Sequence, residues 1–434
     1  MKVLLLGPFV SKNRRLAPPL GLAYMASYLE QAGYNVIIVD SLVMKYGLRD
    51  IVGIIKRNNP DVIGISTVTQ FINDAYDIAK ISKEYNPNCL VVLGGPHPTA
   101  LPIETLNGSK FVDVVVKGEG EITFLELLKA KEKNKFDGIR GICYRNNDKI
   151  FQNPDRPFIE NLDSLPFPAY HLLNMNKYVD RAKHSIKKSG KNNDKIFGCI
   201  SSSRGCPYNC SFCASNVIWG RRWRPRSAEN IVDEMKLLSD KYGIRKIYFA
   251  DDLTTLNKKR ISRICNLIPK EKMDVSWSCP SRVNLIDGEL CNILKKGGCE
   301  TVGLGLESGV QSTLDFLNKN ITLNQSKTAV KTANKSGLKT ESNFIIGVPG
   351  ETKSMINQTL SFAFSIELNH VNFSILTPFP GTKVYNYAKE NNLLLTNDWS
   401  KYTTLNPIIK LKNLTPFELK LFLIKAYLKS LLNN

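Results

Sequence analysis

Three cysteines, Cys206, Cys210 and Cys213, lie within a span of eight positions in the segment SSSRGCPYNCSFCAS. This Cys-x-x-x-Cys-x-x-Cys spacing, on a short loop after a strand, can supply three thiolates to a cubane of iron and sulfide. Three cysteines leave one iron without a protein ligand, and an open coordination position is typical of a catalytic metal site. The alternatives are a structural zinc ion with a distant fourth ligand, such as Cys199 or Cys279, and three unrelated thiols.

The chain around this loop predicts a β/α barrel. Amphipathic helical segments such as SAENIVDEMKLLSDKYG alternate with apolar runs, which follow the loop at 246–252, 275–284, 301–309, 338–352 and 370–382. Repeated β/α units over about 190 residues are typical of a partial or full β/α barrel, whose chemistry collects at the carboxyl ends of its strands.

Side chains suited to chemistry stand at these strand ends. Asp251 and Asp252 end the segment YFADD, and Arg282 lies in SRVN. Glu307 lies in GLGLESG and Gly347 in IIGVPGET. Carboxylates there can pair with a cation, and an arginine can bind a carboxylate as a bidentate fork. The alternative for each aspartate is an ordinary paired surface acid.

The first third of the chain predicts a second α/β unit. Amphipathic segments of helical length alternate with short apolar runs at 2–7, 35–40, 61–67, 89–95 and 112–121. Strands buried on both faces read as continuous Val, Ile and Leu runs, so we expect a doubly wound parallel sheet of about five strands. Ligands of such sheets bind outside the carboxyl ends of the strands.

The carboxyl edge of this expected sheet carries Ser66, Gly94, Gly95, His97 and Gly118. Glycines there let a backbone approach a large flat or phosphate-bearing ligand without Cβ clashes, or they only form tight turns. The chain has no G-x-G-x-x-G after the first strand and no G-x-x-x-x-G-K-[ST], which disfavours a dinucleotide or a nucleoside triphosphate. Ser66 and the three glycines are our candidate cofactor contacts.

The segments APPLGLAYMASYLEQAGYNVIIVD, PDVIGISTVTQ, LGGPHPTALP and VVKGEGE, in this order, resemble the cobalamin-binding domain that precedes many radical S-adenosylmethionine (SAM) enzymes. The Asp-x-His-x-x-Gly loop that supplies the lower axial ligand in better-known cobalamin domains is absent. The loop after the first strand reads GPFVSKNRRLAPPLG instead. The resemblance therefore implies a cobalamin whose lower face lacks a histidine, with His97 as a direct cobalt ligand being the alternative.

With Phe212 just before Cys213, the cysteine loop is identified as the radical SAM motif. The resemblance implies that Cys206, Cys210 and Cys213 hold a 4Fe-4S cluster, whose open iron chelates the amino and carboxylate groups of SAM. An electron passing through the cluster then cleaves the S–C5′ bond and yields a 5′-deoxyadenosyl radical.

The same resemblance assigns roles at the other strand ends. Asp251 and Asp252 would bind the ammonium of the methionine moiety, and Arg282 would bind its carboxylate. Glu307 would hydrogen-bond the ribose, and Gly347 would back the adenine. The resemblance covers nearly residues 1–390, and it implies an electron donor such as a flavodoxin or a ferredoxin.

The function expected from both cofactors is methylation of an unactivated carbon of a small-molecule, lipid or peptide substrate. One alternative keeps the cofactors but closes a ring, rearranges or oxidises the substrate without methyl transfer. A methylthiotransferase acting on tRNA would carry a second three-cysteine cluster near the N-terminus, whereas residues 1–135 contain only Cys89. From another class, the protein could bind cofactors without turnover, which the full set of strand-end residues disfavours.

Lys and Arg number 59 against 39 Asp and Glu, a formal net charge of +20. This balance permits binding to nucleic acid, membrane surfaces or anionic small molecules, but the surplus is spread thinly and indicates a solvated basic surface. The cluster RRWRPRS can grip an anionic substrate or RNA, although cofactor binding or packing suits Arg224 and Arg226 better. Nucleic acid is therefore a disfavoured partner.

No apolar run reaches the roughly 18 residues that a membrane span needs. The N-terminus MKVLLLGPF lacks a cleavage site of small residues, so we expect a cytoplasmic location. Prolines and a polar run, KHSIKKSGKNNDK, indicate a domain boundary near 190. We predict a cobalamin-binding-like domain, a linker, a radical SAM barrel and a helical tail at 1–135, 136–195, 196–390 and 391–434.

The tail segment LTPFELKLFLIKAYLKSLL predicts a helix that begins with a capping box at Thr415 and Glu418. We expect its apolar side to face one way and its lysines the other. Such a helix packs on the barrel, or it lies on a membrane surface near a lipid substrate.

Overall fold

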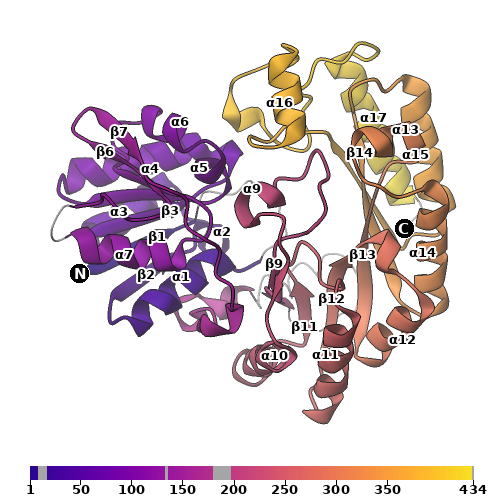
Figure 1. Ribbon diagram of the computed structural model, residues 1–434, viewed down its shortest axis with the longest axis horizontal. Coiled ribbons are helices and arrows are strands. Elements are labelled where there is room, and N and C mark those ends of the chain that lie inside the picture. The colour runs from indigo at the N-terminus through magenta and orange to yellow at the C-terminus, as the bar shows by residue number, and fades with distance from the viewer. Residues whose placement is uncertain (8–16, 132–134, 179–196, 433–434) are drawn as a thin grey trace. The chain divides into compact units, whose positions relative to one another are not determined.

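The computed structural model describes residues 1–7, 17–131, 135–178 and 197–432. The chain divides into two compact units, Met1–Ile196 with Val217–Gly220 and Phe197–Asn216 with Arg221–Asn434 (Figure 1). Most of the loop after the first strand, the polar run and the boundary expected near 190 lie outside the described residues.

The first unit alternates strands and helices, as the sequence pattern predicts. Its strands are β1 (Lys2–Leu6), β2 (Asn35–Val39), β3 (Val62–Ser66), β4 (Leu90–Gly94), β5 (Val114–Val116), β6 (Ile142–Asn146) and β7 (Lys149–Gln152). Its helices are α1 (Leu20–Gln31), α2 (Ser41–Met44), α3 (Leu48–Asn58), α4 (Ile72–Tyr85), α5 (Pro96–Ala100), α6 (Pro102–Asn107) and α7 (Glu121–Lys131). Short 3-10 turns lie at Thr69–Phe71, Leu162–Ser164 and Tyr170–Leu172.

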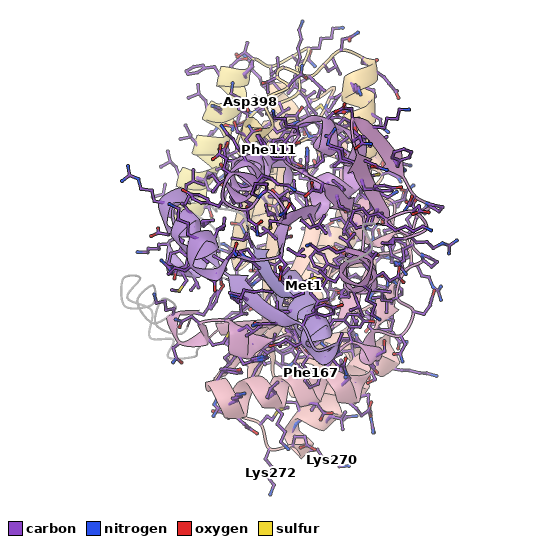
Figure 2. The ribbon with its side chains drawn as sticks, turned by 90° about the vertical axis from the view of Figure 1, so that its left-hand side faces the viewer. Met1, Phe111, Phe167, Lys270, Lys272 and Asp398 are labelled. Carbon is purple, nitrogen blue, oxygen red and sulfur yellow. The ribbon has the colours of Figure 1, made fainter. Side chains whose placement is uncertain are left out.

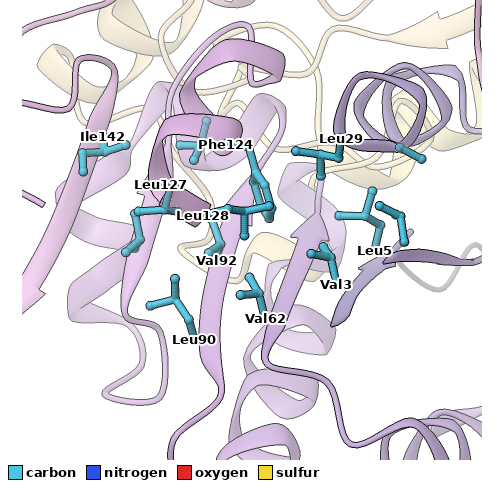
Figure 3. Close-up of a cluster of buried hydrophobic side chains, with 14 of the residues drawn as sticks. Val3, Leu5, Leu29, Val62, Leu90, Val92, Phe124, Leu127, Leu128 and Ile142 are labelled. Atoms are coloured by element: carbon cyan, nitrogen blue, oxygen red, sulfur yellow. The ribbon is translucent and has the colours of Figure 1, made fainter. Parts of the chain in front are cut away.

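The sheet of this unit has the order β2-β1-β3-β4-β5-β6-β7, and its first five strands run parallel. Side chains of these strands pack against α1 and α7 in the core that Figure 3 shows, where Leu29 and Phe124 lie over Val3 and Val62. Removing these large apolar side chains from water is the main force that holds the helices on the sheet. The predicted doubly wound parallel sheet is confirmed.

The connector that we predicted to begin at residue 136 begins later. β6 pairs antiparallel with β5, and β7 pairs antiparallel with β6, so the two strands extend the first sheet. Ile142 and Cys143 are fully buried within it. A two-residue turn at 147–148 joins these strands, and such a hairpin satisfies the backbone groups that an exposed β5 edge would leave unpaired.

The second unit contains the strands β8 (Phe197–Ile200), β9 (Ser203–Arg204), β10 (Arg224–Pro225), β11 (Lys246–Phe249), β12 (Ser276–Ser281), β13 (Cys299–Glu307), β14 (Lys339–Ile346) and β15 (His370–Ile375). From this point of the chain on, the helices are α9 (Ser215–Trp219), α10 (Ala228–Tyr242), α11 (Lys258–Lys270), α12 (Gly288–Lys296), α13 (Gln311–Phe316), α14 (Leu323–Lys335), α15 (Lys353–Ser365), α16 (Lys383–Glu390) and α17 (Pro416–Leu432). Further 3-10 turns lie at Val283–Leu285 and Trp399–Lys401.

Six parallel strands form the main sheet of this unit in the order β15-β14-β13-β12-β11-β8. Sequential strands that pair in parallel through intervening helices are the arrangement of a partial β/α barrel, as predicted. The carboxyl ends of these strands lie at one edge, where β8 leads into the cysteine loop.

Helix α17 begins with the predicted capping box, because Thr415 N donates to Glu418 Oε2 at 2.9 Å and Glu418 N donates to Thr415 Oγ1 at 3.2 Å. Its packing differs from the expectation of one apolar and one basic side. Leu419, Leu423 and Ala426 are buried, and yet large apolar residues are also exposed on the helix. The hydrophobic residues of this segment follow no strict helical period. The sequence alone therefore does not show which side of the helix packs on the protein and which apolar side stays exposed.

The surplus of basic residues is largely solvated. Figure 2 shows Lys270 and Lys272, near the end of α11, extending outward from the molecule. Among the described residues, none of the helices is long and apolar enough to cross a membrane.

Several basic residues of the second unit are buried instead, and Arg226 is one of them. The guanidinium of Arg226 pairs with Glu234 on α10, and the two side chains are 4% and 0% exposed. Arg226 also donates to the carbonyl of Ser201 at 2.9 Å, which fastens the chain beside β8. Breaking such a pair is costly because one charge stays buried without its counter-ion.

Replacement of Glu234 by Gln should therefore lower the free energy of unfolding by about 3 kcal/mol, measured by urea denaturation. Glu229→Gln on the same helix is the matched control, since the side chains of Glu229 and its partner Arg263 are 54% and 60% exposed and the pair should matter little. Equal stabilities of the two variants would contradict this account of the buried pair.

Candidate cofactor site

The cysteine loop is held by backbone contacts from distant parts of the second unit. Ser211 N donates to Leu317 O at 2.9 Å, and Val384 N donates to Ser211 O at 3.0 Å. Asn318 Nδ2 donates to Asn209 O at 2.6 Å. These contacts fix the backbone on both sides of the second cysteine, so the direction of its thiol does not depend on loop conformation alone.

Two of the thiols receive hydrogen bonds from the loop itself. The N–H of Tyr208 donates to the sulfur of Cys206, and the N–H of Ser215 donates to the sulfur of Cys213. Burial outweighs these contacts: it raises the pKa of the Cys206 thiol, and it raises the pKa of Cys213 to about 11. N–H donors stabilise sulfur in its anionic, metal-binding form.

The neighbouring thiols Cys210 and Cys206 contribute to the raised pKa of Cys213, after burial and the charge of Asp252. Within the described residues, no three His, Cys, Asp or Glu side chains are arranged to hold one metal ion between them. A cubane has no such requirement, because each cysteine binds a different iron.

Arg282, at the end of β12, joins the cysteine loop to the barrel. Its Nη1 lies 3.7 Å from Cys210 Sγ, its Nη2 donates to Lys319 O, and its guanidinium stacks 3.8 Å from the ring centroid of Tyr208. The buried Nε has no hydrogen-bond partner among the described residues. Part of the arginine is therefore structural, and one donor remains for a ligand.

The adjacent acids after β11 differ in their surroundings. Asp251 accepts from Ser202 N at 2.7 Å, Ser203 N at 3.1 Å, Ser203 Oγ at 3.0 Å and Thr254 Oγ1 at 3.1 Å, and also from Ser202 Oγ. These contacts tie the start of the cysteine loop to β11. The side chain of Asp252 is exposed to solvent. Its carboxyl group is nevertheless partly desolvated, and this desolvation, together with the charge of Asp251, raises the pKa of Asp252. Asp252 is thus the acid that a ligand can reach.

Glu307 ends β13 with a φ of 64°, in the left-handed region that a non-glycine residue adopts at some cost. Its Oε1 lies 2.7 Å from Lys319 Nζ, and the two side chains are 8% and 9% exposed. Lys319 Nζ also lies 5.9 Å from the centroid of the Phe212 ring, so this pair stands beside the cysteine loop. Sequence reasoning missed Lys319, because no spacing links the segment LNKNIT to the cysteines.

Gly347 follows β14 with a φ of 79°, and a Cβ there would lie 2.6 Å from Leu419 of α17. Its N–H donates to Glu351 Oε2 at 2.7 Å, and Val348 N donates to the same oxygen at 2.9 Å. Burial raises the pKa of Glu351 to about 7. The backbone conformation and the packing against Leu419 therefore require a glycine at this position, independently of any ligand.

The predicted contacts in the first unit meet at one edge of its sheet. Ser66 and Gly94 end β3 and β4 as direct neighbours, and Gly118 follows β5 with its N–H bonded to Thr99 Oγ1 at 3.0 Å. Gly95 has a φ of 96°, and a Cβ there would lie 2.7 Å from Thr67 O. Backbone geometry thus accounts for Gly95 and, with a φ of 66°, for Gly118.

Gly94 is different, since a Cβ there would lie no closer than 3.7 Å to Val116 O, an ordinary contact. Packing within the protein therefore does not require a glycine here, and close approach of a ligand to Gly94 stays a prediction. His97 lies in α5 and is buried, and burial lowers the pKa of its imidazole to about 4.

The cluster RRWRPRS is only partly a surface patch, because Arg221 and Arg222 are exposed whereas two other arginines are buried. Arg224 and Arg226 are 2% and 4% exposed, and Trp223 Nε1 donates to Leu253 O at 2.8 Å. Arg260 Nε donates to Arg226 O at 2.7 Å, so these residues pack beside the base of the cysteine loop. Arg224 and Arg226, being buried, cannot track a nucleic-acid backbone.

Both parts of the chain match known protein families. Residues 200–363 match the model of the Radical SAM superfamily, and residues 9–128 match that of the B12 binding domain. The chain is 44% identical over 434 residues to an uncharacterized methyltransferase of Pyrococcus horikoshii, covering 99% of this chain and 92% of that protein. It is 30% identical to the anaerobic magnesium-protoporphyrin IX monomethyl ester cyclase of Rubrivivax gelatinosus, covering 94% and 74%.

The chain belongs to the B12-binding radical SAM enzymes. Its fold is also that of the radical SAM methyltransferase TsrM of Kitasatospora setae, solved with cobalamin and a [4Fe-4S] cluster bound. That match has a TM-score of 0.75 at 18% identity and covers 91% of this chain and 75% of the other. The resemblance and the fold class expected from the sequence are confirmed, and the individual contacts of this radical SAM enzyme with its cofactors remain predictions.

The pKa of Glu351 gives a pH-dependent prediction for this radical SAM enzyme. Because the folded-state pKa of about 7 lies above the ordinary 4.5, the folded state binds the proton more tightly than the unfolded state. The resulting stabilisation is fully present below pH 4.5 and is lost as the pH rises through 7.

Glu351→Gln cannot ionise and keeps an oxygen for the two backbone donors. Its stability relative to the wild type should rise by about 2–3 kcal/mol between low and neutral pH, seen as a growing difference in Tm. Glu390→Gln, on the exposed end of α16, controls for the substitution itself. A difference in Tm that does not change with pH would refute the assignment.

Proposed function

We propose that the protein transfers a methyl group from cobalamin to an unactivated carbon of a small-molecule, lipid or peptide substrate. The observation that carries this proposal is a three-thiol loop with an orphaned buried donor, Arg282 Nε, beside it, in a chain that also has a B12 binding domain. Similarity to a methyltransferase along nearly the whole chain supports the same reaction.

The residues fit the cofactors by the chemistry of their donors. Cys206, Cys210 and Cys213 would hold the 4Fe-4S cluster, and Ser66 and Gly94 would contact cobalamin, together with Gly95 and Gly118. When bound, the cluster and SAM supply a 5′-deoxyadenosyl radical that abstracts hydrogen, and cobalamin supplies the methyl group.

The chain's own side chains would orient SAM. Asp252 would accept from its ammonium, because Asp251 is occupied by the cysteine loop. Arg282 Nε would donate to its carboxylate, assisted by the positive charge of Lys319. The carboxylate of Glu307 retains acceptor capacity for a ribose hydroxyl beside its bond to Lys319. Phe212 packs in an apolar cluster with Leu317 and Val384 and would keep water from the loop.

A second candidate is radical ring closure or oxidation without methyl transfer. The similarity to a cyclase, at 30% identity over 94% of this chain, favours it. Both candidates need one-electron reduction of the cluster, so we also propose a flavodoxin or a ferredoxin as the physiological electron donor.

Anaerobic incubation of the protein, reconstituted with cluster and cobalamin, with SAM and a reductant separates the candidates. Methyl transfer predicts both 5′-deoxyadenosine and S-adenosylhomocysteine, because one SAM is cleaved and another methylates cobalamin. Ring closure predicts the first product without the second, and a binding protein without turnover predicts neither.

Cys210→Ala should abolish formation of 5′-deoxyadenosine, whereas Cys89→Ala, which removes a buried thiol of the first unit, should retain it. Production by Cys210→Ala would refute every radical mechanism at this loop.

The adjacent aspartates should respond differently to substitution. Asp251→Ala leaves several backbone and hydroxyl donors without an acceptor, and it should cost about 2–4 kcal/mol of stability. Asp252→Asn removes the proposed charge for the SAM ammonium and keeps an oxygen for the N–H of Gly205 and the hydroxyl of Ser215. It should raise the KM for SAM at least tenfold at an unchanged Tm. Equal KM values for Asp252→Asn and the wild type would contradict the assignment.

A further inference from the structure

Helix α17 presents a second apolar face to solvent, opposite the face that packs on β15. Six large side chains on this face are 48–87% exposed: Phe417, Leu421, Ile424, Leu428, Leu431 and Leu432. Because each residue turns a helix by about 100°, positions spaced by three and four form one continuous stripe.

The opposite side of α17 is fixed to the barrel. Ser430 Oγ donates to Val371 O at 3.0 Å, and Tyr427 OH donates to Phe373 O at 3.0 Å, both on β15. Leu419 and Leu423 are buried beside these contacts. The exposed stripe is therefore held outward by a rigid attachment, and the helix cannot rotate to bury it.

Cationic side chains border the stripe. Lys420 is exposed on one border, and Lys425 and Lys429 lie on the other. Lys425 Nζ contacts the neutral Asn357 at 3.2 Å, so its charge is not cancelled there. The acid on this border, Glu418, is paired with Lys353.

We propose that the outward face of α17 binds an anionic membrane surface. An apolar stripe bordered by lysines is the pattern of helices that lie in the membrane interface, with apolar side chains among the acyl chains and ammonium groups at the phosphates. The net charge of +20 and the predicted cytoplasmic location agree with this, because the cytoplasmic leaflet carries the anionic lipids. The inference does not depend on methyl transfer.

A second copy of the chain fits this face less well. In a twofold contact the same patch meets itself, which would bring the lysine borders of both copies together without acids between them. One stripe on a single helix is also small against the roughly 800 Å² per partner that a stable interface buries.

Co-sedimentation of the intact, reconstituted protein with vesicles tests the proposal. Vesicles of phosphatidylcholine with phosphatidylglycerol should bind the wild type at low salt, and vesicles of phosphatidylcholine alone should bind it at least tenfold less. The variant L421Q/I424Q/L428Q should bind the vesicles that contain phosphatidylglycerol at least tenfold less than the wild type does. K420Q/K425Q/K429Q should lose the preference for phosphatidylglycerol and the dependence on salt.

The matched control is I103Q/L395Q/L405Q, which removes three comparably exposed apolar side chains outside α17 and should bind like the wild type. Unchanged formation of 5′-deoxyadenosine would show that each variant is folded. The proposal is overturned if the wild type does not bind anionic vesicles, or if L421Q/I424Q/L428Q binds as the wild type does. It is also overturned if the stripe instead holds a dimer that this variant converts to monomer, as light scattering would show.

Discussion

The guanidinium of Arg282 is the contact on which the candidate site depends. It stacks on Tyr208, approaches Cys210 Sγ and donates to the backbone carbonyl of Lys319, and so joins two segments that are far apart in the sequence. A metal-binding loop with three ligands cannot organise itself as a four-ligand site does, because its missing ligand must come from a bound molecule. The protein therefore supplies the rigidity from outside the loop. The backbone bonds of Ser211 and the carboxylate of Asp251 contribute to the same end.

Much of the fold could be predicted from the sequence, because both units place parallel strands in the interior. Continuous runs such as VLLL and VVLG contain no polar residue, so both faces of these strands must be buried. The amphipathic segment that follows each run covers one of these faces. The β6–β7 hairpin was missed because its strands at the sheet edge carry polar residues, for example Arg145 and Gln152, and read as a connector. The two apolar faces of α17 were missed because hydrophobicity along the chain does not say which side is packed.

The candidate site could be predicted in position, but not in the division of tasks among its residues. Strand ends gave the right neighbourhood for the acids and for Arg282, because the carboxyl ends of parallel strands meet at one edge. Whether a carboxylate serves the fold or a ligand depends on how many donors surround it. The carboxylate of Asp251 accepts from Ser202 and Thr254 among other donors, whereas the adjacent Asp252 is exposed to solvent. Lys319 reaches the site only because the turn after α13 folds back, which no local pattern encodes.

The raised pKa values of Cys206 and Cys213 have a consequence for the protein before it is loaded. A thiol that keeps its proton near neutral pH is a poor nucleophile and a slow partner for oxidants. The same protons must leave when iron binds, so assembly competes with acid and releases protons. Binding of iron by Cys206 and Cys213 therefore becomes more favourable as the pH rises.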